Sequence, residues 1–432
     1  MMQHYIAIVC LSVLVSCSDV APNNQNVATA GDTANQLPLP YATQSVKKFS
    51  KALGWKEGQT PKAPAGFTVQ KFADKLENPR WIYVLPNGDV LIAEAGTKGI
   101  MKNVAAAISG NAQSRLSTGS ADRITLFRDT DNDGLPNERD VFLENLNQPL
   151  GMLLIGNTFY VANTDGIVTF PYKTGQTRIV ATGKQITDLP AGGYNNHWTR
   201  NILASEDNAH IYITVGSSSN VGEQGMDKEV MRANILVMNP DGTNKRVYAS
   251  GLRNPVGAAW APGTKTLWTV VNERDKLGDE LVPDYLTSVK EGGFYGWPYS
   301  YWGQNPDPRM KGSGADLVKK AIVPDVSLGA HTSSLGLAFY NQKAFPEKYH
   351  NGAFIGQHGS WNKSTFSGYK VIFIPFKNGK PSGEEEDFLT GFIANADEVY
   401  GRPVGIAVLP DGSVLVADDA ANTVWRIYAD EK

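Results

Sequence analysis

The chain has 432 residues, of which 19% are charged and 41% hydrophobic, and its formal net charge is −3. This balance is typical of a globular protein and excludes the strongly basic surface that nucleic-acid binding requires. The 43 glycines and 24 prolines are spread along the chain without a collagen-like period, which predicts many turns between short strands.

The N-terminus predicts an exported protein with a lipid anchor. Residues 6–15 form an apolar run that suits a signal segment but falls short of the roughly 20 residues of a membrane helix. The run leads into Leu14-Val15-Ser16-Cys17, which resembles the lipobox of bacterial lipoproteins, where the cysteine carries the lipid. A plain secretory signal and an unprocessed core strand are the alternatives. We expect residues 1–17 to be the signal segment and the protein to lie in the periplasm or at the outer membrane.

Residues 18–45 are rich in Asn, Ala, Thr and Pro and lack an apolar period, so they are expected to form a flexible tether. The propeller domain described next is assigned to residues 46–432, with regular structure beginning near Gly66. The two cysteines, Cys10 and Cys17, both precede this domain, which is therefore expected to hold no disulfide.

A repeated hairpin predicts the fold. Residues 79–94 read as strand, Asn-Gly turn and strand, and residues 403–418 close the chain with a similar segment. Weaker copies lie between them, and the six copies start near residues 79, 149, 201, 255, 335 and 403. These starts are roughly 50 to 80 residues apart, a spacing that suits four-stranded blades with insertions. The chain is thus predicted to be an all-β, six-bladed β-propeller, with a β-sandwich of unrelated hairpins as the alternative.

Propellers bind ligands with loops that leave successive blades, so functional residues should flank the repeated hairpins. Unusual polar groups do occupy such positions. They are residues 197–200, 251–255, 272–280, 331, 357–363 and 401–403.

These polar groups also carry a family resemblance. LRNPVG at 252–257, an acidic loop that ends in Gly278-Asp279-Glu280, and GGFYGWP at 292–298 follow one another in that order. Together they resemble the glucose/sorbosone dehydrogenases, which are sugar dehydrogenases that depend on pyrroloquinoline quinone (PQQ) and are built on a six-bladed propeller. HGSWNK at 358–363 resembles the sorbosone dehydrogenase branch.

The resemblance implies a site for PQQ, an ortho-quinone with three carboxylates. Arg253 and Asn254 stand where the family has a cofactor-binding Arg-Asn pair, and Lys363 is a looser match to its cofactor-binding lysine. Arginine offers a charged, bidentate fork to a carboxylate, so Arg253 and Arg402 are candidate clamps. Salt bridges between blades are the alternative role for both arginines.

His197 matches the family's catalytic histidine, and imidazole titrates near neutral pH, where it can take a hydroxyl proton. The family carries Asp after the glycine that follows the next strand, and this chain has Ser217 there. A hydroxyl does not stabilise imidazolium as a carboxylate does. His331 and His358 are reserve candidates for the base. The family's PQQ-facing tryptophan before the fifth blade has no counterpart at residues 327–331.

Two segments are candidate calcium sites. By resemblance, the carbonyl groups of Arg274 and Asp275 and the side chain of Asp279 would hold a Ca²⁺ linked to the cofactor. Independently, Asp129, Asp131 and Asp133 follow the D-x-D-x-D-G spacing of a calcium loop. A strand-like ITLF precedes the second segment, where an EF-hand has a helix, so an EF-hand is not expected. A structural Ca²⁺ site and a plain Asn-Asp-Gly hairpin turn are equal alternatives for this segment.

We therefore expect a dehydrogenase that uses PQQ and Ca²⁺ to oxidise a sugar, a sugar aldehyde or a polyol and passes electrons to an external acceptor. The insertion at residues 299–323 is expected to set sugar specificity. A calcium-dependent lactonase and a sugar- or protein-binding propeller without enzymatic activity are the alternatives.

Overall fold

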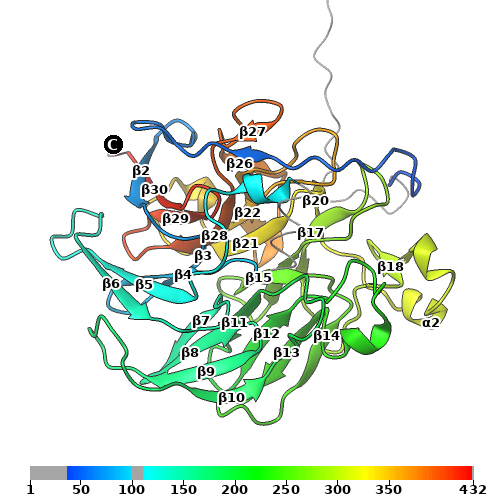
Figure 1. The fold of residues 1–432 in the computed structure, drawn as a ribbon, viewed down its shortest axis with the longest axis horizontal. Coiled ribbons are helices and arrows are strands. Elements are labelled where there is room, and N and C mark those ends of the chain that lie inside the picture. Colours follow the sequence, from blue (N-terminus) through cyan, green and yellow to red (C-terminus); the bar gives the residue numbers. More distant parts are fainter. Residues whose placement is uncertain (1–36, 99–109, 431–432) are drawn as a thin grey trace, which may run out of the picture.

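The computed structural model describes residues 37–98 and 110–430, and Figure 1 shows them as a ring of twisted sheets. The predicted signal segment, Cys17 and most of the predicted tether lie outside these residues. Within the described part of the chain, no helix has the length and apolar character to cross a bilayer.

Six four-stranded antiparallel sheets form the propeller, which confirms the predicted six blades. The first blade consists of β3 (Pro79–Val84), β4 (Val90–Glu94), β5 (Arg123–Arg128) and β6 (Glu138–Leu143). The second consists of β7 (Met152–Ile155), β8 (Thr158–Asn163), β9 (Gly166–Pro171) and β10 (Lys184–Asp188). The third consists of β11 (Arg200–Ala204), β12 (Ile211–Val215), β13 (Asn234–Met238) and β14 (Arg246–Ser250). The fourth blade consists of β15 (Pro255–Trp260), β16 (Leu267–Val271), β17 (Pro283–Ser288) and β20 (Val326–Ala330). The fifth consists of β21 (Ser334–Phe339), β22 (Ala353–Gln357), β23 (Lys370–Ile374) and β26 (Glu386–Leu389). The sixth consists of β28 (Pro403–Val408), β29 (Val414–Asp418), β30 (Thr423–Ala429) and β2 (Phe67–Ala73).

The loops between the blade strands contain short strand pairs and helical turns. The strand pairs are β1 (Lys51–Ala52) with β27 (Glu398–Val399), β18 (Ser300–Tyr301) with β19 (Asn305–Pro306), and β24 (Phe376–Lys377) with β25 (Lys380–Pro381). Within residues 37–98 and 110–430, the helical turns are α2 (Ala315–Val318) and four 3₁₀ turns, Asn111–Ser114, Met226–Glu229, Pro308–Met310 and Glu347–Tyr349. The insertion between β17 and β20 thus contains β18, β19 and α2.

The ring closes by pairing the two ends of the domain. β2 adds to β30 as the outer strand of the last blade, with Phe67 opposite Ala429. Closure covers sheet edges that would otherwise expose unpaired backbone groups. Apolar residues fill the space between neighbouring blades, as Val90 and Ile92 of β4 do against Leu415 of β29. Each such buried side chain contributes about 1.5–3 kcal/mol.

Glycines let the innermost strands of adjacent blades approach closely. A Cβ atom on Gly336 would lie 2.0 Å from the carbonyl oxygen of Val404, and one on Gly405 would lie 2.5 Å from that of Arg80. Real Cβ atoms never come this close, so these positions of the repeat exclude any side chain. The glycine within the repeated hairpin therefore serves the packing of blade against blade.

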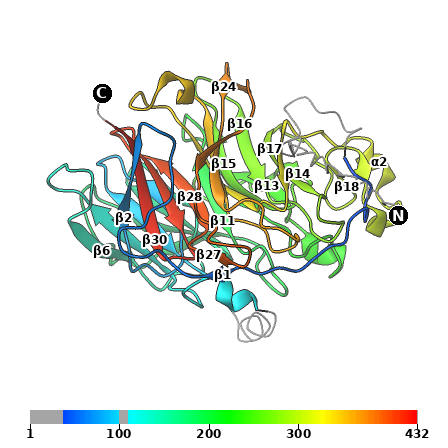
Figure 2. The same cartoon turned by 90° about the horizontal axis from the view of Figure 1, so that it is seen from above.

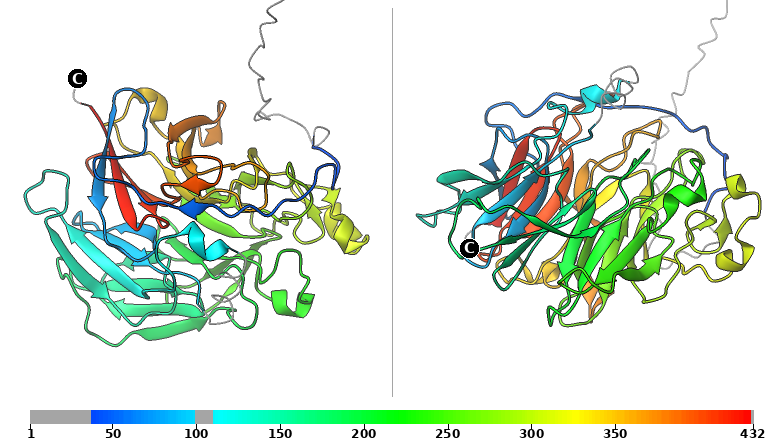
Figure 3. Two further views of the ribbon diagram at one scale, coloured as in Figure 1. Left: turned by 45° about the horizontal axis from the view of Figure 1, so that its top comes forward. Right: turned by 60° about the horizontal axis from the view of Figure 1, so that its bottom comes forward.

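The segment before β2 lies across one end of the propeller, which corrects the expectation that folded structure begins near Gly66. Figures 2 and 3 show this strap (residues 37–65, dark blue) running over the sheets. Tyr41 donates its backbone N–H to Leu277, β1 pairs in parallel with β27, and the Trp55 indole donates to Asp418 at 2.7 Å. The last nine residues of the predicted tether, 37–45, are thus tied to the propeller.

Candidate functional site

A cavity of about 400 Å³ lies at the end of the ring where the innermost strands begin. Its lining comes from the starts of five innermost strands, from the loops beside them and from the strap. The lining residues are Phe49, Arg80, Asn111, Tyr194, Asn196, His197, Trp198, Thr199, Arg253, Asn254, Asn272, Asp275, Ser333, Leu335, His358, Trp361 and Arg402.

Antiparallel register explains why residues so far apart in sequence meet here. In the five blades that line the cavity, the first residue of the innermost strand pairs with the last residue of the next strand, as Pro255 does with Val271 and Pro403 with Asp418. The residue before one strand and the residue after its partner therefore lie at the same end of every blade. The hairpin repeat thus predicts that these side chains lie at one end of the propeller, where the innermost strands begin, and the cavity lies at that end.

His197 stands just before β11, and Ser217 stands just after β12. The Nδ1–H of His197 donates to the carbonyl oxygen of Ser217 at 2.8 Å and lies 3.0 Å from its hydroxyl oxygen. That hydroxyl in turn donates to the carbonyl of Ser219 at 2.6 Å. Burial, reinforced by the positive charge of Arg253, holds the pKa of His197 well below its usual 6.5. The ring is therefore neutral at pH 7, and Nε2 is its proton acceptor.

Gly216 allows the predicted Arg-Asn pair to reach this histidine. A Cβ atom on Gly216 would lie 2.3 Å from Asn254 Oδ1 and 2.6 Å from His197 Cβ. Asn254 Oδ1 is buried and has no hydrogen-bond partner, and both Asn254 and Arg253 line the cavity. A buried amide oxygen without a partner costs free energy, so a ligand that donates a hydrogen bond would stabilise this arrangement.

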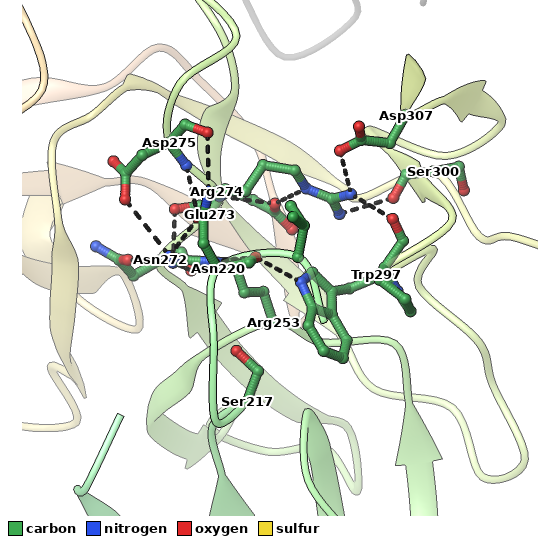
Figure 4. A network of polar contacts seen from close by, with 12 residues as sticks. Ser217, Asn220, Arg253, Asn272, Glu273, Arg274, Asp275, Trp297, Ser300 and Asp307 are labelled. Atoms are coloured by element: carbon green, nitrogen blue, oxygen red, sulfur yellow. Dashed lines mark hydrogen bonds and ion pairs between the residues drawn. The ribbon is translucent and has the colours of Figure 1, made fainter. Parts of the chain in front are cut away.

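Arg253 is held rigidly by backbone and amide oxygens, as Figure 4 shows. Its guanidinium donates to Asn220 Oδ1 at 2.9 Å, to Asn272 Oδ1 at 2.9 Å and to the carbonyl oxygen of Glu273 at 2.7 Å. The Asp275 carboxylate lies 3.5 Å away. Neutral oxygens thus provide most of the contacts of Arg253, and the carboxylate of Asp275 forms an ion pair with it beside the cavity.

The Arg274 side chain points away from the cavity. It is fully buried between its own loop, where it pairs with Glu273 at 2.9 Å, and the insertion after β17, where it pairs with Asp307 at 3.2 Å and donates to the carbonyls of Pro298 and Ser300 (Figure 4). Arg274 therefore anchors the insertion between β17 and β20 to the propeller.

The predicted calcium ligands do not gather around the cavity. Only Asp275 lines it, and the Asp275 carbonyl already accepts hydrogen bonds from Asn220 at 3.1 Å and from the Arg309 guanidinium at 2.8 Å. The Asp279 carboxylate accepts from the backbone N–H of Ser364 at 2.9 Å and from its hydroxyl, away from the cavity lining. The Arg309 guanidinium on the Asp275 carbonyl opposes Ca²⁺, whereas Asp279 Oδ1 is buried without a hydrogen-bond partner, so calcium binding by this set stays a prediction.

Lys363 is also placed elsewhere than the resemblance implies. Its ammonium contacts the Glu280 carboxylate at 3.0 Å and the Asp279 carbonyl at 3.2 Å. Among the described residues, Lys363 does not line the cavity. Its neighbour Trp361 does line the cavity and stacks on Phe49 of the strap, with ring centroids 5.6 Å apart. An aromatic wall is therefore present, although it comes from after β22 and not from before the fifth blade.

The two reserve histidines differ in position. His358 lines the cavity, whereas His331 is buried behind it, with its Nδ1 3.4 Å from the Asp275 carboxylate and its Nε2 2.9 Å from the Gly278 carbonyl. Although burial lowers the pKa of His331, the neighbouring Asp275 carboxylate raises it above 6.5 overall. His331 therefore holds the 275–278 loop in place.

Arg402 lines the cavity from just before β28, the innermost strand of the last blade. Its guanidinium donates to the carbonyls of His358 and Gly359, both at 2.9 Å. Asp419, at the end of the same blade's hairpin, accepts from Arg80 at 2.5 Å and from His358 Nε2 at 2.8 Å. The predicted Arg402 clamp thus belongs to a larger cationic group.

Arg80, Arg115, Asn220 and Asp419 are among the residues in and around the cavity that the sequence patterns did not single out. For Arg80 and Asp419 the signal was present, because Arg80 is the second residue of a repeated strand and Asp419 directly follows one, as Asn272 does. Arg115 and Asn220 come from long loops, where no repeat marks their position.

The second calcium candidate lies on the outer part of the first blade. One ligand atom from each of Asp129, Asp131 and Asp133 lies within 4.8 Å of the others. Asp129 already accepts backbone hydrogen bonds from Asn132 at 2.7 Å and Gly134 at 2.8 Å, as an Asn-Asp-Gly turn requires. Calcium binding by this loop stays a prediction.

In fold, the chain is a six-bladed propeller of the kind seen in PQQ-dependent sugar dehydrogenases. It aligns over 88% of its length with the whole holo PQQ domain of pyranose dehydrogenase from Coprinopsis cinerea, at a TM-score of 0.69 and 20% identity. The calcium structure of the Trichoderma reesei carbohydrate-active enzyme of family AA12 gives a TM-score of 0.67 at 18% identity, over 86% of this chain and 97% of that one.

The chain belongs to the TrAA12-like family, whose model matches residues 61–290 and 306–430. An uncharacterized protein of Borreliella burgdorferi is 28% identical over 85% of this chain and 91% of its own. The aldose sugar dehydrogenase YliI of Escherichia coli is 31% identical over 40% of this chain and 43% of its own. These matches confirm the resemblance to the propeller sugar dehydrogenases, and the sorbosone branch stays a prediction.

Proposed function

We propose that this protein is a PQQ-dependent dehydrogenase that oxidises a sugar, a sugar aldehyde or a polyol. The observation that carries the proposal is a cavity lined by both Arg253 and Arg402, with a neutral, oriented His197 in its wall. The pyranose dehydrogenase and aldose sugar dehydrogenase names of its relatives support an oxidoreductase that acts on sugars.

The cavity residues fit PQQ. Arg80, Arg253 and Arg402 line it against a single carboxylate, Asp275, among the described residues. A tricarboxylate matches that excess of positive charge, because arginine binds carboxylates through paired, charge-assisted hydrogen bonds. When bound, PQQ would supply the electron acceptor, because its quinone takes up a hydride.

His197 would act as the general base. Its Nδ1–H is fixed on Ser217, so Nε2 can accept the proton of a substrate hydroxyl as the neighbouring carbon gives up hydride. The low pKa of His197 keeps this nitrogen unprotonated at neutral pH. Trp198 and Trp361 give the cavity apolar walls that exclude water and suit the carbon face of a sugar ring.

A lactonase is less well supported. Such an enzyme would require several carboxylates converging on one metal ion, whereas the described lining of this cavity is mainly arginine, asparagine and aromatic residues. A binding propeller without activity would not require a histidine held in one tautomer, so His197 favours the enzyme.

Reconstitution tests the three functions together. Purified protein is titrated with PQQ, with and without Ca²⁺, and dye reduction is followed with a panel of aldoses and polyols. Micromolar PQQ binding and substrate-dependent dye reduction are the expected results. Lactone hydrolysis without PQQ would favour the lactonase, and failure to bind PQQ at micromolar levels would overturn the proposal.

The location and partners follow from the N-terminal sequence and the site. We propose export with a lipid on Cys17, a soluble carbohydrate substrate and an external electron acceptor. Globomycin treatment of cells that express the protein tests the lipid, because an unprocessed precursor should accumulate if Cys17 is lipidated.

A further inference from the structure

One carboxylate lies buried in an otherwise exposed turn. Residues 226–230, in the loop between β12 and β13, are all exposed except Glu229, which is 6% exposed. The apolar side chains of Met226 and Val230 are left 40% and 66% exposed. Glutamate is among the residues least often buried in proteins, whereas methionine and valine are among those most often buried. The turn therefore directs a charged side chain inward while its apolar neighbours face outward, which apolar packing does not explain.

The Glu229 carboxylate accepts three hydrogen bonds from one short segment. Its Oε2 accepts from the backbone N–H of Ser218 at 2.7 Å. Its Oε1 accepts from the backbone N–H of Ser219 at 3.1 Å and from the hydroxyl of the same residue at 2.6 Å. Among the described residues, Glu229 forms no ion pair, and a buried charge without a counter-ion is costly. These neutral donors offset that cost, so Glu229 is tied firmly to the segment that follows β12.

The peptide group between Ser217 and Ser218 joins this carboxylate to His197. Its N–H donates to Glu229, and its carbonyl oxygen accepts from His197 Nδ1 at 2.8 Å. A trans peptide group is planar and its N–H and C=O point in opposite directions, so fixing one group fixes the other. The Ser217 hydroxyl, 3.0 Å from the same nitrogen, donates to the carbonyl of Ser219. Both contacts of the imidazole Nδ1 thus belong to a segment that Glu229 holds.

We propose that Glu229 is a positioning residue for His197. By holding the Ser217–Ser218 peptide, it keeps the proton of the neutral imidazole on Nδ1 and leaves Nε2 free to accept a proton from the substrate. Which ring nitrogen carries the proton is set by the hydrogen bond that the other makes. The catalytic consequence rests on the proposed function, whereas the tautomer depends on the geometry alone. The alternative is a purely structural role beside Arg232, whose pKa is lowered by burial and raised in part by the charge of Glu229.

Glu229→Gln tests the proposal, because it keeps the shape of the side chain and replaces one acceptor oxygen by an NH₂ group. Glutamine therefore cannot accept from Ser218 and Ser219 as the carboxylate does. Nitrogen NMR of labelled histidine, in protein without PQQ, reports the tautomer of His197, and a His197→Gln sample assigns its signal. Steady-state dye reduction after reconstitution with PQQ gives kcat and KM. Asp227→Asn removes the same charge from the same turn, at an exposed carboxylate paired with Lys228, and is the matched control.

Wild-type protein and Asp227→Asn should show His197 in the Nδ1–H form, and Glu229→Gln should show a mixture with the Nε2–H form. In dye reduction, Glu229→Gln should lower kcat at least about tenfold and leave KM within about threefold, because hydrogen bonds to a charged group contribute about that factor. Ser219→Ala removes one of the three hydrogen bonds to Glu229 and should shift both readouts in the same direction but less. If Glu229→Gln does not fold, Ser219→Ala decides the question.

The proposal is overturned if the His197 nitrogen shifts of Glu229→Gln, or of Ser219→Ala in its place, match those of Asp227→Asn. A loss of turnover with unchanged nitrogen shifts would also overturn it, because Glu229 would then act on the fold and not on the tautomer. Failure of wild-type protein to bind PQQ would refute the proposed function separately, and the NMR measurement would still test Glu229.

Discussion

His197 Nδ1 lies 2.8 Å from the carbonyl oxygen of Ser217, and the backbone thus does part of the work that the family gives to an aspartate. The serine hydroxyl, 3.0 Å from the same nitrogen, is the second contact. A carbonyl fixes the tautomer but adds no negative charge, so the histidine is oriented without being made more basic.

Ser217→Ala is therefore expected to lower kcat less than about tenfold, because a hydrogen bond of this type contributes roughly 1 kcal/mol and the carbonyl remains.

His197→Ala should lower kcat at least about 100-fold, since a general base contributes a rate factor of about that size, and should leave the PQQ dissociation constant within about threefold. Steady-state dye reduction and PQQ fluorescence measure both variants. Near-normal turnover of His197→Ala would remove this residue as the base.

The pH profile follows from the same histidine. Its pKa is lowered, and the base must be unprotonated, so kcat/KM should stay flat from pH 8 down to about 6.5 and fall only below that value. The profile is measured with a dye whose reduction does not depend on pH. An acidic limb centred above pH 7 would contradict a buried, neutral His197.

Arg253→Lys tests the anchor of the cavity. Lysine cannot reach Asn220, Asn272 and Glu273 together, so both the position of the charge and the loop around it should be lost. We expect PQQ affinity to fall at least about tenfold and Tm to drop by several degrees. Arg246→Lys, an exposed arginine paired with Glu291, is the control and should change neither quantity.

Asp418 predicts a pH dependence of stability. Burial raises the pKa of Asp418 to about 6, above the usual 3.8. Its contribution to stability is therefore complete below pH 3.8 and is lost as the pH rises through 6, at up to about 1.4 kcal/mol per pH unit. Asp418→Asn should remove this part of the slope between pH 4 and 6 in urea unfolding. Parallel slopes for the two proteins would show that Asp418 titrates normally.

Much of the fold could be predicted from the sequence, because hairpins are local. Alternating apolar residues and Asn-Gly or Asp-Gly turns specify strand, turn and strand within about 16 residues, and six such copies specify six blades. The same register places His197, Arg253 and Arg402 at one end of the propeller. The strap escaped prediction because its contacts, such as Trp55 with Asp418, join residues 363 positions apart.

The sequence by itself determined the blades and the end of the propeller at which the site lies, since the turn of each hairpin fixes which end of a strand each residue occupies. Only the tertiary structure decided which way each side chain in the irregular loops points. Arg274 turns to Asp307 and Ser300, leaving Asp275 to line the cavity, because a distant insertion supplies a buried partner. Arg115 joins Arg80 and Arg402 in the same way, since loops without regular backbone take their direction from whatever packs against them.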